Sequence, residues 1–471
     1  MKKHILFLGA LVALILSSCG EEWMTDVVPT NKIDPEEAFN VLSDGRNALN
    51  GVYSLMQESD YQGGSFIMYG TLKGIDVRST DMNSRRIDYY RFVETTENVA
   101  SNFWVEPYIC LASINNGIDN IDKLSTSTAS EEEQKKEIKA NFYALRALCH
   151  FDLLKIYSRI PASLSGDPKN ELGVVHADHV ISKDEKPMRK NLAESYTFII
   201  NDLLEAIKVM PEGAKTPGWF SKDAMKGLLA RIYLYNGDNS EAYTMAKEVI
   251  TAGNYSLIEK GNYATSWGKN SNPEAMLSII NTEEDNAGRG SVGYQWGDQD
   301  NAFRITTSFM EIMNENADDD RLSVIVERTD DEYVTNKFPN AYDNDLHLIR
   351  LSEMYFIAAE AVFKAEANKT EAANLINLVI EKRTGVENTI AEDDVTLERI
   401  VLEKRKEFVG EGHAMFDLVR NKMDIVRTGD DHLIDAPLLI EHDDENKVVL
   451  PIPLTELNAN ENIQQNPTYN R

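Results

Sequence analysis

The chain has little cysteine: only three residues in 471. Cys110 and Cys149 each lie in an apolar, helix-like stretch, which is typical of small buried thiols. A disulfide framework needs more cysteines than this, so the sequence predicts a fold held together by its core. The remaining cysteine, Cys19, stands three residues after the end of an apolar segment at the start of the chain.

Basic residues are also in short supply. Lys and Arg total 48 against 77 Asp and Glu, which gives a formal net charge of -29. Nucleic acids and anionic membrane surfaces attract clusters of cations, so this balance excludes both as electrostatic partners. The simplest effect of the acidity is solubility.

Catalytic and metal-binding motifs are missing as well. The sequence contains neither the Gly-x-Ser-x-Gly nor the Gly-x-x-x-x-Gly-Lys pattern. His176-Ala177-Asp178-His179 lacks the helical spacing that places two ligands on one face, and Asp318–Asp320 lacks the glycine and terminal glutamate of a calcium loop. We therefore predict no catalytic residue, no metal site and no cofactor.

The first nineteen residues have the pattern of an export signal. Lys2 and Lys3 precede an apolar run from Ile5 to Leu16, and Leu16-Ser17-Ser18-Cys19 follows. The run is shorter than the ~20 residues that a spanning helix needs. The segment resembles the lipobox of bacterial lipoproteins, which implies a signal peptide over 1–18, acylation of Cys19 and a tether over 19–33. An ordinary cleaved signal and a transmembrane helix are the alternatives.

Apolar spacing and capping residues predict a mainly α-helical fold. The expected helices cover 34–56, 104–121, 130–157, 192–210, 221–235, 239–252, 348–367, 370–383 and 396–409. Paired helices of this length are typical of tetratricopeptide-like packing, although the residues show no strict repeat. Residues 59–100 and 254–345 are expected to be irregular insertions with short strands such as Met276–Ile280. We divide the chain into an N-terminal helical region, 34–253, and a C-terminal region, 254–471, packed as one globular unit.

Several stretches resemble the SusD/RagB family of nutrient-binding outer-membrane lipoproteins. They are Ala144–Ala147 with Phe151–Tyr157 and Ile160-Pro161, Ala224–Tyr235 with Gly237-Asp238, Ile349–Tyr355 with Ala358–Ala361, Glu403–Phe408 with Glu411–His413 and Phe416–Arg420, and Leu450–Pro453 with Asn462–Pro467. They follow the family's order over nearly the whole mature chain. Glu21-Glu22 also resembles the acidic signal that sends such lipoproteins to the cell surface.

The resemblance implies a SusD-like α-helical scaffold that binds an oligosaccharide at the outer face of the outer membrane. It also implies a partner, a SusC-like TonB-dependent transporter, over which the chain would act as a lid. Capture and delivery need no bond cleavage, so we do not expect an enzyme. Binding of a peptide or another nutrient, glycan hydrolysis and a helical-repeat adaptor are the alternatives.

Sugar binding calls for aromatic rings against the C–H faces and polar groups around the hydroxyls. Trp296 and Tyr294 lie between glycines and polar residues, which predicts an exposed loop and makes them the first candidates. Trp267 is the next candidate. The opposite wall is expected to include Tyr61, Tyr69, Arg78 and Asp81. In contrast, Trp219 is expected to brace the start of a helix, and Trp104 to lie in the core.

Charged residues on otherwise apolar helices are expected to form ion pairs between helices, because an unpaired buried charge is costly. Arg146, Arg405 and Arg420 are such residues. The acids available to them include Glu353, Glu360, Glu407 and Glu411.

Overall fold

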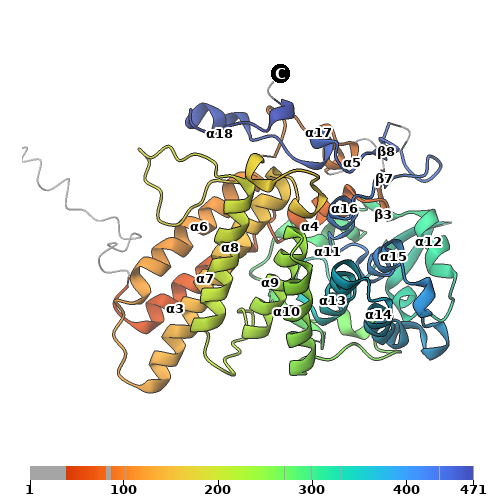
Figure 1. Ribbon diagram of the computed structural model, residues 1–471, viewed down its shortest axis with the longest axis horizontal. Coiled ribbons are helices and arrows are strands. Elements are labelled where there is room, and N and C mark those ends of the chain that lie inside the picture. Colours follow the sequence, from red (N-terminus) through yellow and green to blue (C-terminus); the bar gives the residue numbers. More distant parts are fainter. Residues whose placement is uncertain are drawn as a thin grey trace, which may run out of the picture.

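The computed structural model describes residues 39–80, 86–100, 102–269, 271–298, 300–329, 331–433 and 435–469. Helices dominate them, and long helices that are neighbours in the sequence pack against each other across the molecule (Figure 1). The long helices are α3 (Leu42–Met56), α6 (Asn102–Ile121), α7 (Ala129–Tyr157), α8 (Leu192–Val209), α9 (Lys222–Asn236), α10 (Asn239–Ala252), α13 (Leu351–Glu366), α14 (Lys369–Thr384) and α15 (Leu397–Phe408). The predicted fold class, mainly α, is confirmed.

Capping residues explain where these helices begin and end. Thr128 Oγ1 accepts a hydrogen bond from the Glu131 amide at 3.2 Å, and the Glu131 carboxylate accepts one from the Thr128 amide at 3.1 Å. This capping box starts α7 slightly earlier than the expected residue, 130. Ser221 caps α9, and Gly237 ends it with a φ of +90°. Residues 34–38 lie outside the described residues, and α3 begins only at Leu42.

Shorter helices lie between and beyond the long ones: α4 (Ser65–Leu72), α5 (Ile87–Arg91), α11 (Val292–Trp296), α12 (Thr307–Asn314), α16 (Ala414–Arg420), α17 (Glu445–Val448) and α18 (Leu454–Ala459). The expectation that the two insertions hold only irregular chain and short strands is wrong for α4 and α5 in 59–100 and for α11 and α12 in 254–345. Seven of the eight residues of α4 are buried, so α4 lacks the alternation of apolar and polar faces by which a sequence reveals a helix.

A small antiparallel sheet joins the two insertions. Its strand order is β1 (Val77–Ser79), β3 (Phe303–Ile305), β5 (Glu332–Thr335) and β4 (Ile325–Thr329), with Arg78 opposite Arg304. The expected strand at 276–280 is confirmed as β2 (Ala275–Ile279), which pairs with β6 (Leu346–Arg350). A further pair is β7 (Ile425–Val426) with β8 (Leu439–Ile440).

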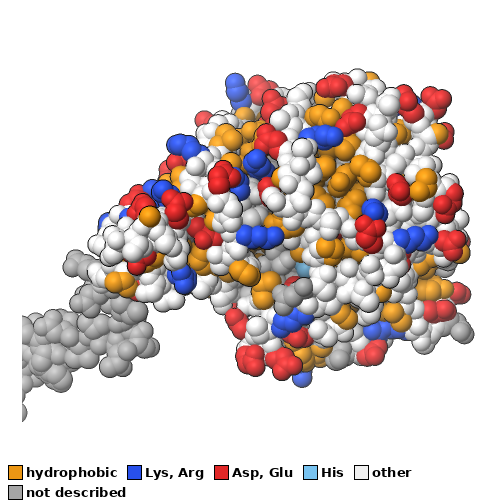
Figure 2. Space-filling view, turned by 90° about the horizontal axis from the view of Figure 1, so that it is seen from below, with side chains coloured by type: hydrophobic (Ala, Val, Ile, Leu, Met, Phe, Trp, Pro, Cys, Tyr) orange, Lys and Arg blue, Asp and Glu red, His pale blue; other side chains and the backbone are white. Residues whose placement is uncertain are grey.

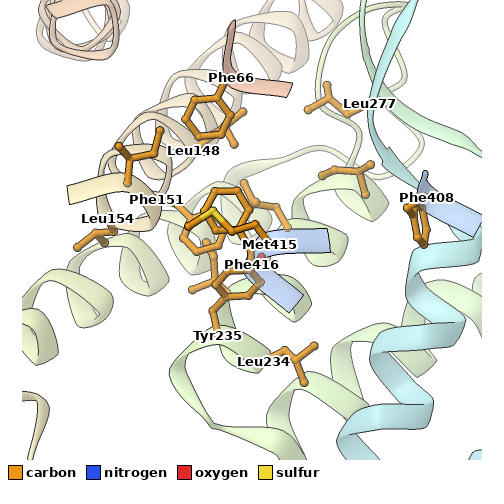
Figure 3. Close-up of a cluster of buried hydrophobic side chains, with 14 of the residues drawn as sticks. Phe66, Leu148, Phe151, Leu154, Leu234, Tyr235, Leu277, Phe408, Met415 and Phe416 are labelled. Carbon is orange, nitrogen blue, oxygen red and sulfur yellow. The ribbon is translucent and has the colours of Figure 1, made fainter. Parts of the chain in front are cut away.

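The core lies where the first and second halves of the chain meet (Figure 3). Phe66 from α4, Phe151 from α7 and Tyr235 from α9 lie in the same cluster as Phe408 from α15 and Phe416 from α16. Burial of such large side chains contributes roughly 1.5–3 kcal/mol each. Trp104, Cys110 and Cys149 are buried, and both cysteines are free, as expected.

Buried arginines pair with acids, as predicted, but not always with the acids considered. Arg146 pairs with Asp202 at 2.6 Å. Arg420 pairs with Glu360, one of the expected acids. Two other expected acids hold cations that were not considered: Glu353 pairs with Arg231, and Glu411 with Arg350 and Lys337. Arg405 pairs with Asp76 at 2.5 Å. These ion pairs connect helices and strands that are distant in sequence.

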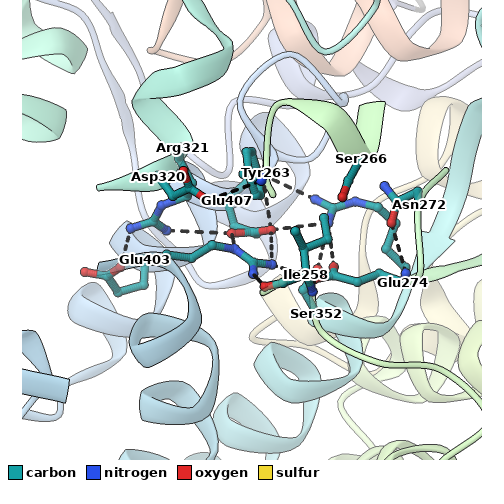
Figure 4. A network of polar contacts seen from close by, with 12 residues as sticks. Ile258, Tyr263, Ser266, Asn272, Glu274, Asp320, Arg321, Ser352, Glu403 and Glu407 are labelled. Atoms are coloured by element: carbon teal, nitrogen blue, oxygen red, sulfur yellow. Dashed lines mark hydrogen bonds and ion pairs between the residues drawn. The ribbon is translucent and has the colours of Figure 1, made fainter. Parts of the chain in front are cut away.

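The fourth expected acid, Glu407, is the centre of a buried network (Figure 4). Its carboxylate accepts hydrogen bonds from Arg383 at 3.0 and 3.1 Å and from Arg350 at 3.2 Å. Glu274 holds the same two guanidinium groups at 2.6 and 2.8 Å. Burial favours the protonated acid, but the charges of Arg383 and Arg350 outweigh it and hold the pKa of Glu407 well below its usual range.

Two further features bear on function. Among the described helices, none combines the length and the apolar character that crossing a bilayer requires. In the described part of the chain, no three His, Cys, Asp or Glu side chains gather as metal ligands would. His176 stacks on Phe198, and His179 bridges Asp178 and Glu185 at the surface.

We expect Glu407→Gln to lower the free energy of unfolding by about 3–5 kcal/mol, because two buried guanidinium groups lose a charged partner. The matched control is Glu259→Gln, which breaks the exposed pair with Lys382 and should cost about 1 kcal/mol or less. Urea unfolding of both variants measures the difference. Equal midpoints would contradict a structural role for the network.

Candidate ligand-binding face

A groove with a volume of about 500 Å³ lies beside the four-stranded sheet. Its walls come from α11, from β4 and β5, and from the segment 336–341. Apolar and polar groups alternate around it: Val326 is 42% exposed, and Asp298, Asn336 and Asn340 are also exposed. A groove that mixes apolar surface with a few polar groups is the usual form of a small-molecule site.

Two tyrosines stack next to this groove. The rings of Tyr294 and Tyr342 lie 5.7 Å apart between centroids, with their planes 28° from parallel. Tyr342 is 41% exposed and Tyr294 is half-buried. Each directly follows a residue that lines the groove, Gly293 and Ala341 respectively. The pair therefore offers an exposed aromatic surface at the edge of the groove.

Close backbone contact brings the two tyrosines together. A Cβ atom at Gly293 would lie 2.0 Å from the carbonyl oxygen of Asn340, so only glycine fits there. Ser291 Oγ donates to the carbonyl of Ala341 at 2.6 Å. These contacts fix α11 against segment 336–341 and preform the stack without a ligand.

The predicted exposed loop around Trp296 is wrong. Val292–Trp296 is a short helix, and Trp296 is only 1% exposed, with its ring 5.9 Å from that of Phe303. Trp296 borders the groove from within the core. Its carbonyl oxygen accepts a hydrogen bond from Arg328 at 3.1 Å. Trp296 therefore supports the groove and presents little ring surface to a ligand.

Charged groups in the groove and in the neighbouring sheet form ion pairs. Arg328 forms an ion pair with the exposed carboxylate of Asp298. Arg78 and Arg304 both pair with Glu332, at 3.3 and 3.0 Å. Burial raises the pKa of Glu332, but the hydrogen bond from Arg304 and the two positive charges lower it overall. The structure thus places Arg78 in β1, at the edge of the sheet opposite β4 and outside the residues that line the groove, with its charge already engaged.

The other predicted residues lie elsewhere. Tyr61 and Tyr69 are fully buried, and Tyr61 donates to Asp152 at 2.8 Å. Trp267 is 5% exposed and lies against Lys337 and Arg350. The expectation that Tyr61 and Tyr69 form a wall of the site at the surface is wrong in this structure, and Trp267, the separate second candidate, also packs inside the protein. Asp81 and Cys19 lie outside the described residues.

Sequence reasoning missed Tyr342. The signal was present: an aromatic residue between turn-forming residues in Asn340-Ala341-Tyr342-Asp343-Asn344. The same signal pointed to Tyr294, but only the fold shows that the two segments meet.

Comparison with known proteins gives two family matches that together cover most of the chain. Residues 276–469 match the model of the SusD family, and residues 29–234 match a SusD-like model described as starch-binding and associating with the outer membrane. A SusD-like protein of Formosa agariphila, P2, is 23% identical over the full length of both chains.

Solved structures agree. A putative sugar binding protein of Bacteroides vulgatus is 34% identical, with a TM-score of 0.85 over 92% of this chain and 99% of that chain. A SusD superfamily protein of the same species is 31% identical, with a TM-score of 0.85 over 92% of this chain and 100% of the other.

The geometry predicts that the loss of buried Trp296 and the loss of exposed Tyr342 change the free energy of unfolding by different amounts. Trp296→Ala should lower the free energy of unfolding by about 3–5 kcal/mol, since it opens a cavity in the core. Tyr342→Ala should cost about 1 kcal/mol or less, since its ring is exposed and loses mainly one stacking contact. Urea unfolding compares the two. A large loss for Tyr342→Ala would mean that the stack is a structural element.

Proposed function

The chain belongs to the SusD family, and from this premise we propose that it binds oligosaccharides at the cell surface as an outer-membrane lipoprotein. In this proposal it delivers the captured glycan to a SusC-like TonB-dependent transporter. The similarity to a putative sugar binding protein at 34% identity supports a sugar as the ligand class. The matched model described as starch-binding and associating with the outer membrane supports both the ligand and the location.

The observation that carries the proposal is the stacked pair Tyr294–Tyr342 beside the mixed groove. An exposed aromatic surface suits the C–H face of a sugar ring, and the neighbouring amide and carboxylate groups suit its hydroxyls. Asn336, Asn340 and Asp298 supply such groups within the same groove. The preformed contact at Gly293 limits the ordering that binding would cost.

The groove favours binding over cleavage. Glycoside hydrolysis commonly uses two carboxyl groups on either side of the bond. Among the described residues that line the groove, Asp298 is the one acid, and Arg328 pairs with it. A single carboxylate held by a guanidinium group suits a hydrogen-bond acceptor for hydroxyls.

Acylation of Cys19 supplies the anchor in this proposal. Stable retention on a membrane needs more than one acyl chain, because one chain alone binds reversibly. The acidic pair Glu21-Glu22 next to the anchor supports export to the outer face. The face seen from below carries Lys and Arg close to Asp and Glu, with hydrophobic patches between them (Figure 2). The net charge of the chain, -29, suits a neutral sugar better than a polyanion.

Tyr342→Ala should weaken glycan binding at least about tenfold, or about 1.4 kcal/mol, because aromatic anchors account for much of a binding energy. Tyr342→Phe keeps the ring and should retain most of the affinity. Calorimetry on the mature protein, after a screen of soluble polysaccharides, measures the effect. Tyr243→Ala is the matched control, since Tyr243 is a half-buried tyrosine of α10 that bonds Glu371. Wild-type affinity in Tyr342→Ala would contradict the assigned site.

Cys19→Ser should release the protein from the outer membrane, because the serine cannot form the thioether to which the lipid is attached. In intact, unlysed cells, added protease should digest the wild-type protein, because it lies on the outer face. When the wild-type protein is purified from membranes, the SusC-like barrel should copurify with it. Protection of the wild-type chain in intact cells would contradict the surface location.

A further inference from the structure

A second groove opens beside α3, and the glycan-binding proposal does not use it. Its volume is about 290 Å³. One wall is the exposed side of α3, and the other is formed by the segment before α9 and the end of β2. The residues that matter below are Asn50, Ser54, Gln57, Trp219, Ile280 and Asp285.

Trp219 is the aromatic side chain of this groove. It is half-buried, and its indole Nε1 donates to Asn50 Oδ1 at 2.9 Å. The hydrogen bond fixes the ring against α3. The next residue, Phe220, is held too, because its amide donates to Tyr53 Oη at 2.9 Å. The indole is therefore a preformed surface whose position does not depend on a ligand.

The rest of the groove combines an apolar patch with polar groups. Ile280 is 40% exposed, and Asn50, Ser54 and Asp285 are exposed around it. Gln57 is buried and ties the two walls together, since its Nε2 donates to Asn281 Oδ1, to the Ile280 carbonyl at 3.1 Å and to the Asp285 carbonyl at 2.8 Å. A fixed ring with hydroxyl and amide groups around it has the same chemistry as the first groove.

A short path through the chain connects the two grooves. Ser59 follows Gln57 by two residues and touches Gly290, where an added Cβ atom would lie 2.2 Å from the Ser59 Cβ. Gly293, which lines the first groove, lies three residues after Gly290. This path limits the separation between Gln57 and Gly293 to roughly 25 Å.

We propose that the groove around Trp219 is a second glycan subsite, which binds another stretch of the same polysaccharide chain that occupies the Tyr294–Tyr342 groove. This inference rests on the glycan-binding function proposed above. A polymer that reaches both grooves binds the second one intramolecularly, so the two sites together bind a long chain more tightly than either does alone. A short oligosaccharide occupies one groove and gains nothing from the other. The second groove thus selects for chain length.

Trp219 also lies close to the start of α9, where a purely structural role would be to brace the helix. The two roles differ in what a substitution changes. A brace affects stability and leaves the dependence on chain length as it was. A subsite affects the binding of long chains and leaves short ones unchanged.

The test compares binding of long and short ligands. Affinity electrophoresis in gels with soluble starch, laminarin or xylan identifies a polysaccharide that retards the mature wild-type protein, and calorimetry then uses the corresponding di- and trisaccharides. We expect Trp219→Ala to lower the affinity for the polysaccharide at least about tenfold and to leave the short ligands unchanged. Tyr342→Ala should weaken both.

A second variant blocks the groove without removing Trp219, so the test does not depend on the folding of Trp219→Ala. Ser54→Arg adds a long side chain at the mouth of the groove from an exposed position of α3 and leaves Trp219 in place. It should reproduce the loss for long chains with an unchanged melting temperature. If both variants bind the polysaccharide as the wild type does, the second subsite is overturned while the first stands. Equal losses for long and short ligands also overturn it. If the wild type binds no glycan at all, the proposed function itself fails.

Discussion

The buried charge of Glu407 is the constraint on which the rest of the structure depends. Arg350 at the end of β6 and Arg383 on α14 both pair with this carboxylate from α15, and Glu274, just before β2, pairs with the same two arginines. Each charge is stable in the interior only while the others stay in place, because an unpaired buried ion is costly. The network therefore fixes the second insertion against the C-terminal helices. It also reaches the binding face: Lys337 donates to the Glu407 carbonyl at 2.7 Å, and its neighbours Asn336 and Phe338 line the groove.

The same network explains the position of Trp267. The ammonium group of Lys337 lies 4.9 Å from its ring, and the guanidinium group of Arg350 lies 5.1 Å from it. Phe408 covers Arg350 from another side at 4.5 Å. Aromatic faces attract cations and shield them from water. In the sequence, a tryptophan among Ser, Thr and Gly suggested a ring that stacks on a sugar. The cations that contact this ring come from segments far along the chain, so the residues next to it in the sequence do not indicate them.

The helices could largely be predicted from the sequence, since apolar spacing and capping residues act locally. Ser221 and Gly237 mark both ends of α9, and residue 157 was the expected end of α7. The four-stranded sheet could not be predicted in the same way. It pairs Arg78 with Arg304 through strands of three residues, which are too short to show a period of two. Nor could α4, whose buried surroundings remove the amphipathic pattern.

The binding face shows why the right segment led to the wrong tryptophan. In an extended loop, Tyr294 and Trp296 would point to the same side, and both were expected to meet a ligand. In α11, residues two apart differ by about 200° around the axis, so the two rings point in nearly opposite directions. Tyr294 therefore reaches the surface while Trp296 enters the core. At the surface, Tyr342 stacks on Tyr294 in place of Trp296. The close contact between Gly293 and Asn340 holds the segment that carries Tyr342 in this position. A five-residue helix and one glycine thus decide which aromatic residues are available for binding.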